Sequence, residues 1–457
     1  MSSNAPLSSS PLVDVDSRRD VRSRLYKLAW PAMLDHLMHS AVFLINTAIV
    51  GRLGAEALSA AGISNQLMWF MITPVVGLSA GVLAMVARAT GRGDLDQIPR
   101  VVRQGLVISI VFTGIVTAVV VLLAEQILQL LGAPGPVIAH ASNFLRIATL
   151  FTVFQSVVVV VGSAVRATGD TRSPMVATGI MIILNGVIGY LLGFDVIGPG
   201  GLGLMGVALA FNVARLAAAT YILSVLLRQP AGHGLLRGPW KDQCIVRRIG
   251  KVSGPAAAEQ VITVGGIFAS NVVALQLSTA SFAAHNVIGP ITSLPFMYSY
   301  GLSVAAAAAV GQTLGAQRPR LARRYGSEAV VGGAVGTAAL GLVMVLVPEQ
   351  FMAVFTSDPA VIAAGAGPRR ALGFCAVVYG PGNVLPGVLR GAGDTRSTMV
   401  IALVALWAVR LPAVLVLTLG FGLGRRGVWL GLVADYLARS LLSYIRFASS
   451  KWQTIKV

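Results

Sequence analysis

Long apolar stretches recur along the whole chain and constrain its fold more than any other feature. Most are long enough for the roughly 20 residues that an α-helix needs to cross a bilayer. We find twelve such stretches, at about residues 28–50, 58–88, 101–123, 137–161, 174–194, 202–227, 252–276, 282–312, 327–347, 368–388, 398–419 and 427–446. Charged residues make up only 11% of the 457 residues, against about 25% in soluble domains. The sequence therefore predicts an all-α integral membrane protein with twelve transmembrane helices.

The placement of the basic residues predicts the orientation in the membrane. The net charge is +18, and most Lys and Arg lie in the two tails and in the loops on the same side as the tails. Because cytoplasmic loops carry an excess of Lys and Arg, both termini are expected in the cytoplasm, in a multi-pass protein of the plasma (inner) membrane. The basic patches are not interleaved with stacking aromatics, so nucleic acid is not an expected partner. The first 27 residues lack the apolar core of a signal peptide.

The two halves of the chain repeat. The segment GSAVRATGDTRSPMV at 162–176 returns as PGVLRGAGDTRSTMV at 386–400, and the same offset of 224 pairs Pro31 with Pro255. Six spans separate the copies, so both begin on the same side and form parallel repeats about an axis along the membrane normal. We therefore expect two six-helix bundles related by a pseudo-two-fold, with substrate between them. The predicted parts are an N-terminal tail (1–27), a first lobe (28–227), a cytoplasmic linker (228–251), a second lobe (252–446) and a C-terminal tail (447–457).

Several segments resemble one transporter family. They are KLAWPAMLDHLMHSAVFLINTAIVGRLG, AAGIS, AAHNV, WAVRLP, GVWLGLVAD and the doubled R-x-x-GDTRS. Over nearly the whole chain the sequence is similar to multidrug and toxic compound extrusion (MATE) transporters, and within them to the DNA-damage-inducible-type branch. The resemblance implies two six-helix lobes around a V-shaped cleft. It also implies multidrug efflux, the export of cationic or amphipathic xenobiotics in exchange for H⁺ or Na⁺ by alternating access.

The chain departs from the family at the usual ion site. Asn46 stands where the family carries the aspartate of a Val-Asp-Thr triplet in the first helix. In the fifth stretch Asn185 matches a family asparagine, but Gly189 replaces the aspartate that often follows it. The tenth stretch contains no acid between residues 371 and 390. The coupling ion must therefore use other groups.

Asp35 is the first candidate for an ion-coupling residue. An ionisable group at the centre of a bilayer costs about 2.5–3.5 kcal/mol, so a carboxylate within a span suggests a function. Asp35, His39 and Asn46 share one face of the first predicted helix and extend over about 16 Å. We hypothesise that Asp35 binds the coupling proton and that His39 shares or relays it. The alternative is a hydrogen bond that only serves packing.

Glu259 occupies the position equivalent to Asp35 in the second half and completes the set of candidate ion-coupling residues, Asp35, His39, Asn46 and Glu259. Two acids at symmetric positions suit a cation held between the lobes, although Glu259 could instead satisfy polar groups where the lobes meet. Further substrate-binding candidates are polar, aromatic or adaptable side chains in the spans, each of which could equally be packing: Met68, Asn185, Asn271, His285, Asn286 and Tyr298.

Other charged residues point to structural roles. Asp435 and Arg439 are one helical turn apart, and mutual neutralisation is the expected role, with Arg410 in the preceding span. Asp170 and Asp394 follow the two repeat arginines and are expected to cap the next helices.

No cofactor, metal site or catalytic motif is expected. The sequence lacks a G-x-x-x-x-G-K-[ST] phosphate loop, so the energy source is an ion gradient and the chain is not an enzyme. The expected partners are a small cationic substrate, the coupling ion and membrane lipid, and the protein is expected to be a monomer. Two alternatives stay open. One is a flippase for lipid-linked oligosaccharides, which would need a basic cleft, and the other is a passive channel. Cys244 and Cys375 are expected to be free thiols.

Overall fold

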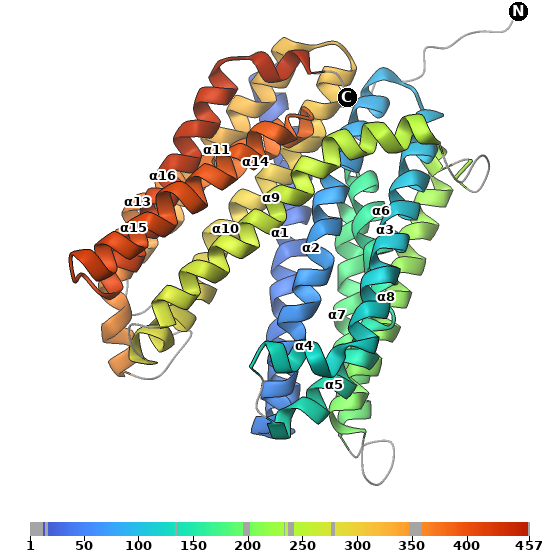
Figure 1. The fold of residues 1–457 in the computed structure, drawn as a ribbon. Coiled ribbons are helices and arrows are strands. Elements are labelled where there is room, and N and C mark those ends of the chain that lie inside the picture. Colours follow the sequence, from blue (N-terminus) through green and yellow to red (C-terminus); the bar gives the residue numbers. More distant parts are fainter. Residues whose placement is uncertain are drawn as a thin grey trace, which may run out of the picture. The chain divides into compact units, whose positions relative to one another are not determined.

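The computed structural model describes residues 12–13, 17–132, 135–194, 202–232, 234–235, 242–275, 279–346 and 359–455. Within these ranges the regular structure is entirely helical, which confirms the predicted fold class (Figure 1). Nine of the described helices are long and apolar enough to cross a membrane, or ten if one bent pair is a single span. Cys244 and Cys375 are free thiols.

The chain divides into two compact units, which we call the N unit and the C unit. The N unit consists of Leu34–Thr90 and Asp94–Ala257, and the C unit of Met1–Met33, Gly91–Gly93 and Ala258–Val457. Apart from the three residues Gly91–Gly93, the chain passes between the units twice, within α1 (Arg18–Gly51) and within α9 (Gln243–Leu275). Both passages lie two residues after a proline of the repeat, Pro31 or Pro255.

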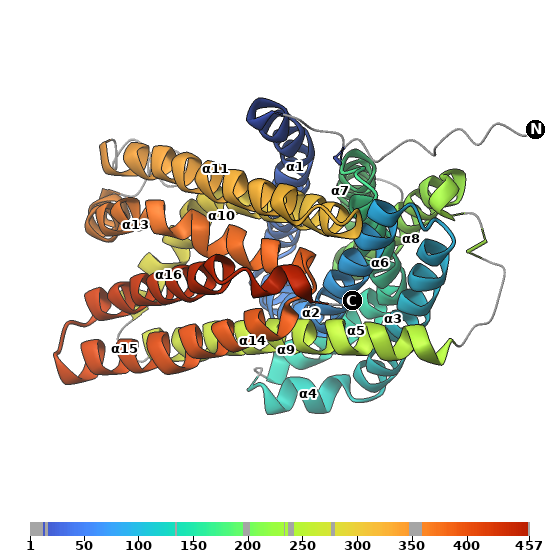
Figure 2. The ribbon, with the colours of Figure 1, turned by 90° about the horizontal axis from the view of Figure 1, so that it is seen from above.

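The N unit is a bundle of α2 (Ala55–Arg92), α3 (Gln97–Leu122), α4 (Ala124–Leu130), α5 (Gly135–Thr149), α6 (Thr152–Ala167), α7 (Arg172–Gly193) and α8 (Gly203–Arg228). Helices α3, α6 and α8 pack side by side (Figure 2). Part of its core is a cluster of apolar side chains that includes Leu128, Phe144 and Leu145, all without exposed surface.

The C unit contains α10 (Thr279–Gly315), α11 (Pro319–Leu346), α13 (Pro359–Gly391), α14 (Thr395–Leu403), α15 (Leu411–Leu415) and α16 (Arg425–Ala448). Two π-helical segments, Val404–Arg410 and Val416–Gly420, flank α15. Helices α11 and α13 approach closely because each contributes glycines. A Cβ at Gly380 would collide with the carbonyl of Gly333, and one at Gly373 with the carbonyl of Gly341. Small residues of this kind let membrane helices pack backbone to backbone.

The repeat also relates the helix boundaries. Adding 224 to the start of α5 and to the end of α6 gives residues 359 and 391, the bounds of α13. The span expected at 137–161 corresponds to two helices, α5 and α6, which are bent by 46° at residues 150–151.

Side chains from neighbouring helices explain this break. Asn212 donates to the carbonyl of Ile147 (2.7 Å) and Arg215 to that of Ala148 (2.6 Å), both in the last turn of α5. The last carbonyls of a helix need partners from outside it, and here α8 provides them. The positive charge of Arg215 is also favourable at a helix C-terminus.

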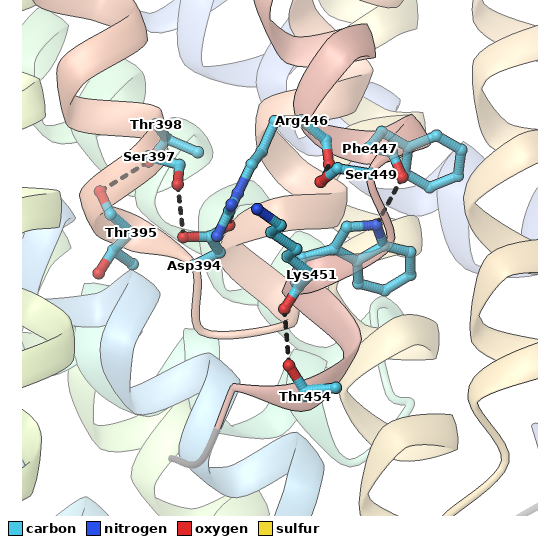
Figure 3. A network of polar contacts seen from close by, with 10 residues as sticks. Asp394, Thr395, Ser397, Thr398, Arg446, Phe447, Ser449, Lys451 and Thr454 are labelled. Carbon is cyan, nitrogen blue, oxygen red and sulfur yellow. Dashed lines mark hydrogen bonds and ion pairs between the residues drawn. The ribbon is translucent and has the colours of Figure 1, made fainter.

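The start of α1 and the segment after α16 both pack within the C unit. Helix α1 starts at Arg18 and is held by an ion pair from Arg22 to Glu328 (2.6 Å) and by contact between the hydroxyls of Tyr26 and Tyr298 (3.1 Å). At the other end Trp452 is fully buried, stacks on Phe447, and donates its indole N–H to the Phe447 carbonyl (2.9 Å) (Figure 3). Residues expected as tails therefore extend the helical structure. The expected linker likewise includes the first turns of α9, which begins at Gln243.

Candidate functional site

Asp35 lies in α1, in the part that belongs to the N unit, and is 4% exposed. Its Oδ2 accepts a hydrogen bond of 2.6 Å from Nη2 of Arg166, in the last turn of α6. Arg166 is the first residue of the R-x-x-GDTRS motif. The carboxylate thus has a positive partner from a different helix. The sequence predicts only a capping role for this motif and does not identify Arg166 as the partner of Asp35.

The second oxygen of Asp35 is less well satisfied. Oδ1 is buried without a hydrogen-bond partner, and Nε2 of His39 lies 4.0 Å away, beyond hydrogen-bond distance. The His39 side chain is 40% exposed. An unsatisfied acceptor beside a half-exposed imidazole can receive a proton with little rearrangement.

Asn46 and Asn185 are both buried, at 4% and 1% exposure. Helices α1 and α7 pack here, because a Cβ at Gly186 would lie 3.5 Å from the side chain of Ile45. The carbonyl oxygen of the Asn46 amide and the amino group of the Asn185 amide each lack a hydrogen-bond partner. A buried acceptor and a buried donor that lack partners are each costly to the folded state.

Glu259 lies in α9, in the part that belongs to the C unit, and is 5% exposed. Its Oε2 accepts a hydrogen bond of 2.6 Å from the hydroxyl of Thr398 in α14. In the described part of the chain no arginine or lysine forms an ion pair with Glu259. The two symmetric acids therefore have different kinds of partner, a guanidinium for Asp35 and a hydroxyl for Glu259.

The repeat equivalents of the two partners do not reproduce these contacts. Arg390 corresponds to Arg166, but its Nε donates to the carbonyl of Pro386 in its own helix (3.2 Å). The equivalent of Thr398 is Pro174, which has no donor. The N unit therefore has no hydroxyl at the position from which Thr398 contacts Glu259 in the C unit.

The remaining substrate-binding candidates lie in separate places. Met68 is buried in the core of the N unit, and its sulfur is 3.7 Å from Nη2 of Arg215. In the C unit the Tyr298 hydroxyl lies 3.1 Å from both the Tyr26 hydroxyl and the Gly332 carbonyl. The side chains of three further candidates, Asn271, His285 and Asn286, lie outside the described residues.

The expected neutralisation of Asp435 is confirmed, with an additional partner. Nη2 of Arg439 lies 3.4 Å from Oδ1, and Nη1 of Arg410 lies 3.6 Å from Oδ2. Asp435 itself is 1% exposed. These arginines are engaged inside the C unit, and Arg215 is similarly engaged at the end of α5 in the N unit.

The two repeat aspartates differ in their contacts. Asp170 caps α7 as predicted, since its Oδ1 accepts the backbone N–H groups of Arg172 and Ser173 (both 3.0 Å). The prediction is wrong for Asp394, which makes no side-chain cap of α14. Its carboxylate instead binds Nε of Arg446 (2.6 Å) and the Ser397 hydroxyl (2.7 Å) (Figure 3).

Comparison with known proteins identifies the same two repeats in the chain. The MatE family model matches the chain twice, over residues 31–191 and 255–416. The two matches begin at Pro31 and Pro255, which are 224 residues apart. The chain belongs to the MatE family. Its members are transporters, so this chain is a multi-pass membrane transporter and not an enzyme. Its place in the DNA-damage-inducible-type branch stays a prediction.

Individual MatE relatives match nearly end to end. A probable multidrug resistance protein NorM of Thermotoga maritima is 27% identical over 438 residues, covering 95% of this chain and 94% of the relative. One of Deinococcus radiodurans is 29% identical over 452 residues, covering 96% and 97%. Among solved structures, MATE in the bent conformation matches with a TM-score of 0.88 at 19% identity, covering 97% of this chain and 98% of that one. An outward-facing multidrug resistance MATE transporter has a TM-score of 0.85. The predicted fold of two repeated six-helix bundles is thereby confirmed.

Proposed function

We propose that this MatE transporter is a secondary antiporter, which exports cationic or amphipathic organic compounds in exchange for H⁺ or Na⁺ by alternating access. The observation that carries the proposal is a buried carboxylate at the same repeat position in each unit, Asp35 and Glu259. Both acids lie within long apolar helices. The protein would work as a monomer in the plasma membrane with both termini in the cytoplasm.

The physical reason is charge compensation. A buried carboxylate is stable only with a positive partner or with enough hydrogen-bond donors. A proton, a sodium ion and a cationic substrate can all provide the positive charge, and a site that accepts only one at a time couples their movements. Exchange then requires no separate catalytic group.

The proposed roles follow from the surroundings of each residue. Asp35 binds the coupling ion, with the proton passing by way of His39, and Asn46 provides a further polar group on the same face of α1. Glu259 attracts the cationic cargo. The substrate-binding residues we propose are those that the sequence indicates: Met68, Asn185, Asn271, His285, Asn286 and Tyr298. The names of the NorM relatives support a drug-like cargo.

The buried arginines give less support to a lipid-linked oligosaccharide flippase. Such a carrier needs basic side chains available for phosphate groups. Arg410 and Arg439 both contact Asp435, and Arg215 donates to the end of α5. The ion gradient remains the proposed energy source, since each elementary charge moved across 100 mV corresponds to about 2.3 kcal/mol.

Uptake of ethidium into everted membrane vesicles tests the proposal. We expect uptake to require an imposed pH gradient or sodium gradient, and to stop when a protonophore or a sodium ionophore collapses that gradient. Vesicles without the protein are the control. Uptake that never exceeds equilibration would indicate a channel, and absence of ethidium uptake would contradict the proposed cargo class.

A further inference from the structure

The ion pair between Asp35 and Arg166 suggests a role for Arg166, which the proposed function does not include. The Asp35 side chain is 6% exposed and that of Arg166 20% exposed, and they come from helices 131 positions apart in sequence. We infer that Arg166 is an internal cation, which occupies Asp35 whenever neither the coupling ion nor a cationic substrate does. This inference rests on the proposed function, in which Asp35 is the ion-coupling acid.

The burial of Asp35 makes release of Arg166 an exchange. Removing one member of a buried ion pair leaves an uncompensated charge, which is strongly unfavourable. Arg166 therefore leaves the carboxylate only as a proton, a sodium ion or a cationic substrate arrives. Because Arg166 neutralises Asp35, a carrier without bound ion or substrate can change conformation without an uncompensated charge in the membrane.

The geometry of the pair suits displacement. Arg166 uses one nitrogen on one oxygen, whereas strong arginine–carboxylate pairs are bidentate. The other oxygen, Oδ1, is buried and has no hydrogen-bond partner. Among the described residues of the N unit, the titratable groups facing Asp35 are His36 and His39 of α1, together with Arg166 of α6. Helix α7 presents Gly179 to the neighbouring Met38.

The second copy of the motif provides an internal comparison. Arg390 stands at the position of Arg166 but donates to a carbonyl of its own helix, and Glu259 binds Thr398 instead. The internal cation is therefore a property of the N unit. Arg390→Gln is a matched control, because it removes the same charge from the same motif position without touching an acid.

The test measures the dissociation constant of ethidium for the detergent-solubilised full-length protein as a function of pH. An opposite charge next to a carboxylate shifts its titration by about 1–3 pH units. In Arg166→Gln we expect ethidium to bind about tenfold or more tightly at alkaline pH. We also expect the pH midpoint of binding to move upward by about one unit or more, because the proton now competes without Arg166. Arg166→Lys should restore most of the wild-type profile, and Arg390→Gln should leave it unchanged.

A folded Arg166→Gln protein with the wild-type affinity and midpoint would overturn the inference. Should that variant not fold, Asp35→Asn is compared with Asp35→Asn/Arg166→Gln. We expect these two to bind ethidium alike, since Arg166 acts only through Asp35, and a clear difference between them would also overturn it. Failure of the proposed function is distinguishable. If the proposed function fails, Asp35→Asn keeps gradient-driven uptake. If Asp35→Asn loses that uptake but Arg166→Gln keeps the wild-type binding profile, only the role of Arg166 is rejected.

Discussion

Asp35 in the N unit and Glu259 in the C unit are repeat equivalents with different partners. Asp35 is bound to the guanidinium of Arg166, whereas Glu259 is bound to the hydroxyl of Thr398. One buried carboxylate is neutralised by the protein itself and the other is only hydrogen-bonded. The comparison indicates that a duplicated acid has separated into two tasks, which we assign as energy coupling at Asp35 and cation affinity at Glu259.

A second repeat pair shows how local backbone decides the partner of a charge. Arg215 and Arg439 are 224 residues apart. Arg215 donates to a backbone carbonyl in the buried last turn of α5, and its guanidinium carbon lies 5.4 Å from the centroid of the Phe211 ring. In the C unit α13 is continuous at the equivalent place, so it offers no free helix end. Arg439 instead pairs with Asp435, which stands where the N unit has Phe211.

The largest expected effect is on Asp435, which two buried arginines share. Asp435→Asn leaves both guanidinium groups without a carboxylate, so we expect the free energy of unfolding to fall by about 3–5 kcal/mol. Denaturation of the detergent-solubilised protein measures it. Glu125→Gln, which breaks an exposed pair with Arg146, is the control and should cost at most about 1 kcal/mol. Equal effects of the two changes would contradict the assigned role of Asp435.

Arg215→Leu should have a smaller effect of the same kind. It leaves the carbonyl of Ala148 without its charged donor, which costs about 1.5–3 kcal/mol. We expect the loss to appear also as faster hydrogen exchange in the last turn of α5. Arg439→Leu should leave exchange at that turn unchanged. If Arg215→Leu and Arg439→Leu both accelerate hydrogen exchange in the last turn of α5, the break between α5 and α6 does not explain why the two arginines have different partners.

The smallest of the three expected effects on stability is that of Thr398→Val, which tests the partner of Glu259 in the C unit. The variant removes the only donor that the described structure gives to the Glu259 carboxylate, at a cost of about 1–3 kcal/mol. Thr398→Ser keeps the hydroxyl and is the matched control, expected to retain most of the stability. A Val variant as stable as wild type would mean that water replaces the hydroxyl and that Thr398 does not hold Glu259.

Much of this arrangement could be predicted from the sequence because it depends on local pattern. The apolar stretches gave the helices, the offset of 224 gave the repeat, and the spacing of Asp435 and Arg439 gave their contact. The break between α5 and α6 could not be predicted, because the donors that complete it, Asn212 and Arg215, come from a helix more than 60 residues away.

The partners of the two acids were missed for a related reason. Arg166 begins the first copy of the R-x-x-GDTRS motif and Thr398 directly follows the second copy, and the sequence indicates only a capping role for this region. Which arginine of that motif reaches Asp35 depends on how α6 packs against α1, and hydrophobic periodicity carries no information about that contact.

The most direct test of the two separate tasks is the initial rate of ethidium uptake into everted vesicles. The rate is measured as a function of ethidium concentration, with and without a pH gradient, for Asp35→Asn and for Glu259→Gln. We predict that Asp35→Asn loses the stimulation by the gradient. Glu259→Gln should keep that stimulation but need about tenfold more ethidium for half-maximal rate, as expected for the loss of one charge interaction of about 1.4 kcal/mol. Stimulation that survives in Asp35→Asn, or stimulation that is lost in Glu259→Gln, would contradict the account.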